Sequence, residues 1–135
     1  MKLGNAPSWV PASGHALRHA GIHFDAVRIA GALGEEVAFE IMQLTDFHAG
    51  PIVRESTGEQ YMYFLLPPQS TAAFSWPACA RALSRNTRDG RSAAFVGVPA
   101  LEGLTWPLDW RSRPSIEVPF VELRLLHETV MCAVR

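Results

Sequence analysis

The segment 51–68 constrains the fold of this chain most strongly, because it places a turn between two short apolar runs. Residues 51–55 (Pro-Ile-Val-Arg-Glu) and 61–66 (Tyr-Met-Tyr-Phe-Leu-Leu) are rich in β-branched and aromatic side chains, and Gly58 lies in the polar stretch between them. This pattern predicts a β-hairpin. The Pro-Pro pair at 67–68 ends the second strand, because proline cannot donate a hydrogen bond to a neighbouring strand. An antiparallel pair is therefore expected near the middle of the chain.

The most regular helical pattern covers residues 35–45. Val37, Ile41 and Leu44 recur at steps of four and three residues, which places them on one face of a helix. The acidic pair at 35–36 would then lie in the first turn, where the helix dipole favours negative charge. The other expected elements are a short helix over 11–20, strands over 22–29, 78–85 and 93–99, a short edge strand over 106–110, and a last helix over 120–134.

These elements predict an α+β fold with a mostly antiparallel central sheet and flanking helices. The stretch 86–90 (Asn-Thr-Arg-Asp-Gly) is a strong turn signal, so the strands over 78–85 and 93–99 are expected to pair as a second hairpin. A length of 135 residues corresponds to one domain. We expect it to cover residues 11–135, with residues 1–10 as an N-terminal arm.

Composition and charge indicate an ordinary globular protein. The chain has 48% hydrophobic and 19% charged residues and a formal net charge of −1, so no global charge attracts it to nucleic acid. No apolar run approaches the roughly 18 residues needed to cross a membrane, and residues 1–7 lack the apolar stretch of a signal peptide. A cytoplasmic protein with no membrane partner is expected. Cys79 and Cys132 have no metal-like spacing and are expected to be buried thiols.

Several stretches, in the same order, resemble one known family. Residues 50–68 (Gly-Pro-Ile-Val-Arg-Glu-Ser-Thr-Gly-Glu-Gln-Tyr-Met-Tyr-Phe-Leu-Leu-Pro-Pro) resemble the segment TPTVRTPSGGRHLYFRVP, which is typical of the N-terminal domain of bifunctional DNA primase–polymerases (prim–pol). Residues 24–27 stand where that family has its hDhD strand. Residues 90–99 look like its GGYVVAPPS strand, and residues 104–110 match the continuation of that strand. The resemblance is greatest to short, divergent prim–pol-like proteins, and it implies an RRM-related single domain.

In working members of that family, two carboxylates one residue apart bind divalent cations, and a histidine on the hairpin strand contacts nucleotide phosphates. In this chain Asp25 stands at the position of the first carboxylate. Val27 stands at the position of the second carboxylate, and Tyr61 at the position of the histidine. Because cation catalysis needs several oxygen ligands, the resemblance implies a non-catalytic domain without metal or cofactor, with Asp25 and Tyr61 as a remnant active-site floor. Alternatively, Asp25 is bonded to neighbouring backbone or to Arg28 or Arg54.

Arginines are the main candidates for ligand contacts, because guanidinium groups bind phosphate. Most of them surround the turn at 86–90, and the full set is Arg54, Arg81, Arg85, Arg88 and Arg91. Trp76, Trp106 and Trp110 are candidates for stacking on bases. The last two are more simply explained by core or edge packing.

Three functions are compatible with these residues. The first is a non-catalytic prim–pol-like module that binds nucleic acid or nucleotides or acts in regulation. The second is a protein–protein module, for example a homodimer, because the aromatic side chains exceed what one core needs; this argument uses Trp9, Phe74, Trp76 and residues 118–120. The third is a residual metal-dependent nucleotidyl-transfer enzyme, in which acids from elsewhere join Asp25 around Mg²⁺ or Mn²⁺.

Overall fold

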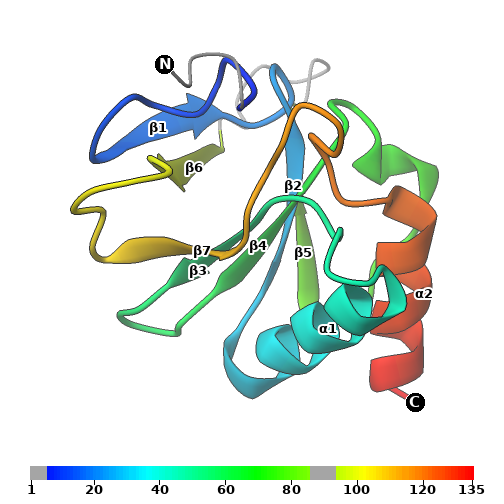
Figure 1. Ribbon diagram of the computed structural model, residues 1–135. Coiled ribbons are helices and arrows are strands. Elements are labelled where there is room, and N and C mark those ends of the chain that lie inside the picture. The colour runs from blue at the N-terminus through cyan, green and yellow to red at the C-terminus, as the bar shows by residue number, and fades with distance from the viewer. Residues whose placement is uncertain (1–5, 86–93) are drawn as a thin grey trace.

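The computed structural model describes residues 6–85 and 94–135 and shows an α+β domain (Figure 1). Its main sheet is antiparallel and consists of β2 (Asp25–Ile29), β3 (Ile52–Glu55), β4 (Met62–Leu66), β5 (Ala80–Leu83) and β7 (Leu108–Ser112). These five strands lie in the order β5-β2-β4-β3-β7. A separate two-stranded ribbon pairs β1 (His15–His19) with β6 (Phe95–Pro99). The helices are α1 (Gly31–Leu44), α2 (Leu123–Ala133) and the short 3-10 helix η1 (Thr71–Ala73).

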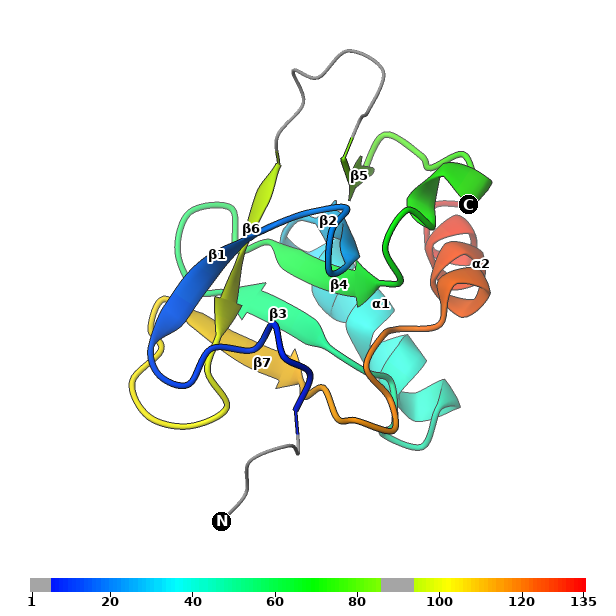
Figure 2. The same ribbon diagram turned by 90° about the horizontal axis from the view of Figure 1, so that it is seen from above.

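The two faces of the main sheet are covered by different layers, as the view from above in Figure 2 shows. Both α1 and α2 pack on one face, where Val27, Ile29 and Phe64 are fully buried against them. The β1–β6 ribbon crosses part of the other face, where Ala26 and Leu65 are fully buried. Successive strand residues point to opposite faces. The position of a residue along its strand therefore decides which of the two cores it joins.

Trp9 anchors the N-terminal segment in the core between the main sheet and the β1–β6 ribbon, which we call the second core. Its side chain is only 5% exposed. Its ring meets Phe24 edge-on at 5.1 Å and stacks on Phe120 at 6.4 Å. The indole thus joins the N-terminal segment to the start of β2 and to the segment before α2. The sequence-based argument that counted Trp9 as surplus to the core is therefore wrong for this residue.

Several expectations about the fold class and its elements are confirmed. The fold is α+β with antiparallel sheets, and β3 and β4 form the hairpin predicted around Gly58. Strand β7 lies at one edge of the main sheet, overlapping the predicted edge strand over 106–110. Both α1 and α2 lie where the apolar periodicity predicts helices. In the part of the chain that the structure describes, no helix is long and apolar enough to cross a membrane.

Two expectations about pairing are wrong. The predicted helix over 11–20 is replaced by β1, because residues 15–19 pair along their whole length with β6. This long-range ladder outweighs the local preference for a helix. The predicted hairpin between 78–85 and 93–99 is also absent from the described residues, since β5 pairs with β2 whereas β6 pairs with β1. The two strands belong to different sheets, and the turn at 86–90 lies outside the described residues.

Two expectations about acidic and cysteine side chains are also wrong. Helix α1 begins at Gly31, one turn earlier than predicted, so Glu35 and Glu36 do not lie in its first turn. The interpretation of this pair as partners of the helix dipole is therefore wrong. Cys79 and Cys132 are both exposed free thiols, which corrects the expectation that they are buried.

Candidate nucleic-acid interface

Asp25, at the start of β2, is fully buried, and four donors occupy its carboxylate. The backbone N–H of Gln69 at 2.9 Å and the hydroxyl of Ser84 at 2.7 Å donate to Oδ1. Thr71 donates to Oδ2 through its backbone N–H at 3.0 Å and its hydroxyl at 2.8 Å. Backbone and hydroxyl groups therefore hold this carboxylate, as one of the two sequence-based alternatives predicted. Asp25 is therefore a structural link that connects β2 to η1 and to the end of β5.

The register of the β2–β4 pair separates Asp25 from Tyr61. Asp25 lies opposite Leu66, whereas Tyr61 precedes Met62, the partner of Ile29. At about 3.4 Å per residue, the five steps from Leu66 to Tyr61 span about 17 Å. The two residues therefore lie at opposite ends of the strand pair and do not share a floor, which corrects the expectation from the sequence.

Tyr61 lies beside Arg28 instead. The guanidinium carbon of Arg28 is 4.2 Å from the centroid of the Tyr61 ring, which is a cation–π contact. The rings of Tyr61 and Tyr63 meet edge-on at 6.2 Å. Arg28 and Tyr63 are also direct partners in the β2–β4 register. The three side chains are half-buried and form a compact basic and aromatic group, so Arg28 is not a partner of Asp25.

Arg81 of β5 extends this group by one strand. The β2–β5 register places Arg81 directly opposite Arg28. Like charges in opposed positions of an antiparallel pair repel each other. In the described part of the chain, neither arginine has a carboxylate within the 4.0 Å of an ion pair. We call the group of Arg28, Tyr61, Tyr63 and Arg81 the Arg–Tyr patch.

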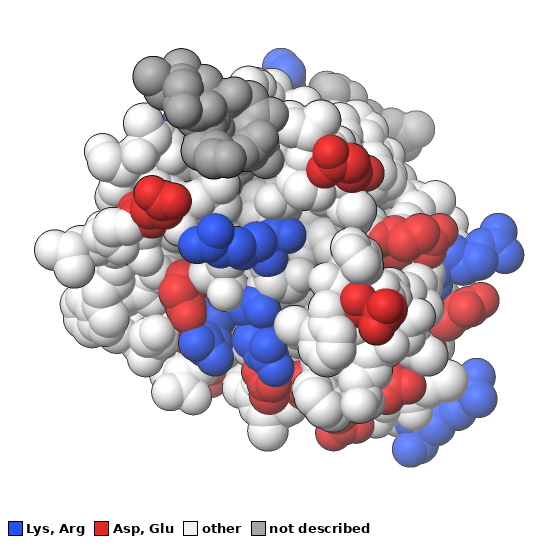
Figure 3. Space-filling view, viewed as in Figure 1, with Lys and Arg blue, Asp and Glu red and all other residues white. Residues whose placement is uncertain are grey.

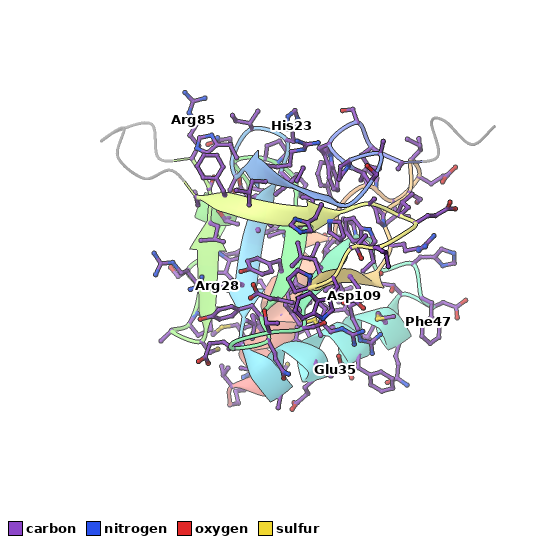
Figure 4. The ribbon with its side chains drawn as sticks, turned by 90° about the vertical axis from the view of Figure 1, so that its left-hand side faces the viewer. His23, Arg28, Glu35, Phe47, Arg85 and Asp109 are labelled. Atoms are coloured by element: carbon purple, nitrogen blue, oxygen red, sulfur yellow. The ribbon has the colours of Figure 1, made fainter. Side chains whose placement is uncertain are left out.

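The Arg–Tyr patch lies on the face of the main sheet that the helices do not cover. Arg28 points to the same side as Ala26, which packs under the β1–β6 ribbon, because residues two apart share a face. Figure 4 shows Arg28 on this side, below the ribbon. Arg81 is exposed. Burial raises the pKa of Tyr63 above its ordinary value of 10.0, and the charge of Glu55 raises it further. The Tyr63 hydroxyl therefore stays protonated at neutral pH and can donate a hydrogen bond.

Two other arginines, one on β3 and one on the edge strand β7, are paired with carboxylates. Arg54 donates to Asp109 through Nε at 3.1 Å and Nη2 at 2.6 Å. Arg111 donates to Glu35 through Nε at 2.9 Å and Nη2 at 2.6 Å, and these hydrogen bonds hold the pKa of Glu35 below its ordinary value. Figure 3 shows blue and red side chains next to each other on this side of the molecule. Arg54, an expected phosphate ligand, is therefore already neutralised.

Arg85 lies apart from the Arg–Tyr patch. Figure 4 shows it beyond the far end of β5, well away from Arg28. Its backbone packs against Gly21, whose φ of +93° and missing Cβ permit the approach, since a Cβ there would lie 2.3 Å from the Arg85 nitrogen. Arg88 and Arg91 lie outside the described residues. Of the three proposed arginines that the structure describes, only Arg81 lies in the patch.

The three tryptophans considered for stacking lie in different places. Trp76 lines a hollow of about 530 Å³ along the outer edge of β5, together with Arg81 and Arg85. Trp110 is half-buried, and its indole N–H donates to a backbone carbonyl at 3.2 Å, which confirms the packing interpretation for this residue. Trp106 is 73% exposed, so that interpretation is wrong for Trp106.

Sequence reasoning missed Arg28 as a ligand contact and named it only as a partner for Asp25. Two signals were present in the sequence. Arg28 is the one charged residue in the run Ala26–Ala30, and the spacing of Tyr61 and Tyr63 places both rings on one face of a strand. What the sequence did not contain was the register that brings these side chains together.

In comparisons with known proteins, no family model, curated protein or solved structure matches this chain. Within residues 6–85 and 94–135, no group of three or more His, Cys, Asp or Glu side chains is placed to hold a metal ion. The candidate site is therefore defined by its geometry and charge.

Proposed function

We propose that this chain is a non-catalytic, prim–pol-like module that binds single-stranded nucleic acid or nucleotides on the open face of its main sheet. The observation that carries this proposal is the pair of opposed arginines, Arg28 and Arg81, beside two tyrosines. The resemblance of the sequence to prim–pol domains supports the same class of ligand, because those domains take nucleotides and template. The α+β fold with helices on one face of an antiparallel sheet is compatible with an RRM-related ancestry.

A phosphate group would relieve the repulsion between the two arginines. Neighbouring strands lie about 4.8 Å apart, so the guanidinium groups of Arg28 and Arg81 can reach the same phosphate. Hydrogen bonds between guanidinium and phosphate are charge-assisted and frequently bidentate. The cation–π contact with Tyr61 orients Arg28 in advance, which lowers the entropic cost of binding.

The tyrosines supply a surface for bases. Aromatic side chains on an open sheet stack on the bases of single strands in RRM-type domains, and each stacked base contributes about 1–3 kcal/mol. Stacking and phosphate contacts do not distinguish between bases. We therefore expect weak binding without sequence preference. Two phosphate contacts give a slope of about −1.4 for the logarithm of affinity against the logarithm of salt concentration.

The test is the fluorescence anisotropy of labelled oligo-dT and oligo-rU at about 50 mM and about 200 mM salt. The double variant Arg28→Gln/Arg81→Gln should bind at least about tenfold more weakly than the unmodified protein. The matched control is Arg124→Gln/Arg135→Gln, which removes the same charge from exposed positions at the other side of the molecule. Competition by ATP would show that nucleotides take the same site. Absent binding, or equal weakening by both double variants, would contradict the proposal.

Stability offers a second readout that separates a binding role from a structural one. Arg81→Gln removes a like-charge contact, so its free energy of unfolding should rise by about 0.2–1 kcal/mol while its binding weakens. Urea unfolding measures this change. A variant that loses stability together with binding would show that Arg81 is needed for the fold. That result would contradict the proposed role of Arg81 in binding phosphate.

A further inference from the structure

A groove runs between α1 and α2, on the face of the helix layer that points away from the main sheet. Figure 1 shows the two helices side by side at this surface. The groove has a volume of about 350 Å³, and its apolar lining comes from Val37, Leu44, Leu125 and Ala133. Leu44 is 60% exposed. The groove therefore presents apolar surface to solvent in a concave site.

Carboxylates line the same groove. Glu36 and Glu40 project from successive turns of α1, and Glu128 projects from α2. No lysine or arginine is among the described side chains that line it. Among the described residues, none of these three glutamates has an ion-pair partner within 4.0 Å. Two like charges four residues apart destabilise a helix slightly. The pair Glu36 and Glu40 therefore lowers the stability of α1 by a small amount.

We propose that this groove docks a basic amphipathic helix of a partner protein. An apolar groove with an acidic rim is complementary to a helix whose apolar stripe is flanked by lysine or arginine. The eight residue steps from Glu36 to Leu44 span about 12 Å of helix at 1.5 Å per residue. That length accommodates about two turns of a docked helix, with apolar anchors at i, i+4 and i+7. This inference is independent of the proposed nucleic-acid function, because the Arg–Tyr patch lies on the opposite face of the sheet.

The probe is a synthetic amphipathic peptide of leucine and lysine, with leucine at helical spacing, and its counterpart has glutamate in place of lysine. Alkylation of two exposed thiols reports where the peptide binds. Cys132 lies in the wall of the groove, whereas Cys79 lies outside it. The rate of alkylation of each thiol is followed by mass spectrometry. Saturating leucine–lysine peptide should slow alkylation of Cys132 about tenfold and leave Cys79 unchanged, because a bound helix covers only the groove thiol.

A charge-matched pair of variants tests the acidic rim. The triple variant Glu36→Gln/Glu40→Gln/Glu128→Gln should bind the labelled peptide about tenfold more weakly. The control Glu59→Gln/Glu102→Gln/Glu117→Gln has the same net charge and alters exposed positions elsewhere, so its affinity should stay within about twofold.

Four results would overturn the proposal. The first two are equal weakening by both triple variants and equal protection of both thiols. The third is equal protection by the glutamate peptide. The last is protection of Cys132 at rising protein concentration without peptide, which would assign the groove to a second copy of this chain.

Discussion

Replacing Asp25 with alanine would remove the acceptor of two backbone N–H groups, those of Gln69 and Thr71, and of two hydroxyls. The hydroxyls can rotate toward other acceptors, but the two N–H groups are fixed by the backbone. A buried N–H without a partner costs about 1–3 kcal/mol, so we expect Asp25→Ala to lose about 2–6 kcal/mol of unfolding free energy. Since whole domains are stable by only about 5–15 kcal/mol, this variant is close to the limit of folding.

The variant Asp25→Asn is therefore the more informative protein. It keeps the shape and one carbonyl oxygen, but its amide group faces donors and leaves one N–H without an acceptor. We expect a loss of about 1–3 kcal/mol, measured by urea unfolding with tryptophan fluorescence and circular dichroism. The control is Asp46→Asn, which makes the same chemical change at an exposed position and should stay within about 0.5 kcal/mol.

A loss below about 1 kcal/mol for Asp25→Ala would refute the assignment of Asp25 as a structural link. A second measurement tests the residual-enzyme alternative directly. If Mn²⁺ raised the melting temperature of the unmodified protein but not that of Asp25→Asn, the carboxylate would be a cation ligand. We expect no Mn²⁺ effect that depends on Asp25, because its oxygens already accept four hydrogen bonds.

Three further predictions concern stability. In the folded state Arg111 holds the pKa of Glu35 below its ordinary value of 4.5, so the pair stabilises the fold at neutral pH and this contribution is lost as pH falls through the folded pKa. Both side chains are partly exposed, so Glu35→Gln should cost less than about 1 kcal/mol at neutral pH. This cost should shrink as pH is lowered through the folded pKa of Glu35, as a series of urea unfolding curves from neutral to acidic pH would show. Gly21→Ala should lower the unfolding free energy by about 1–3 kcal/mol, because its Cβ would meet the Arg85 backbone at a φ of +93°; an unchanged melting temperature would contradict this close approach. Trp9→Ala should cost about 3–5 kcal/mol in urea unfolding, and a loss below about 1 kcal/mol would show that the N-terminal segment contributes little to the second core.

Local sequence patterns were sufficient for the elements whose contacts are local. The β3–β4 hairpin depends on two apolar runs and the turn between them, and the helices depend on apolar periodicity. By contrast, β1 exists because residues 15–19 find a partner in residues 95–99, far along the chain. No window around 11–20 contains that partner, so the local helical pattern gave the wrong element.

In the candidate site, too, the sequence identified residues by their chemistry but did not show which of them lie together. Arg81 could be named from the sequence because guanidinium chemistry alone makes it a candidate for phosphate. Arg54 was named for the same reason, but Asp109 on the neighbouring strand β7 neutralises it. Asp25 and Tyr61 were placed together by resemblance, and the β2–β4 register separates them. Register is a tertiary property, because it is fixed by which side chains fill the two cores.

The β1–β6 ribbon has a consequence for how the molecule opens. Its two strands hydrogen-bond to each other and form a sheet apart from the five-stranded one, so side-chain packing, through Val96 and Val98, fixes the ribbon over the main sheet. Such a unit can separate at a lower free energy than global unfolding. Amide hydrogens of β1 and β6 should therefore exchange with solvent faster than those of the central strands β2 and β4. Each such opening would expose Ala26 and Leu65 and lengthen the open strip of sheet beside Arg28.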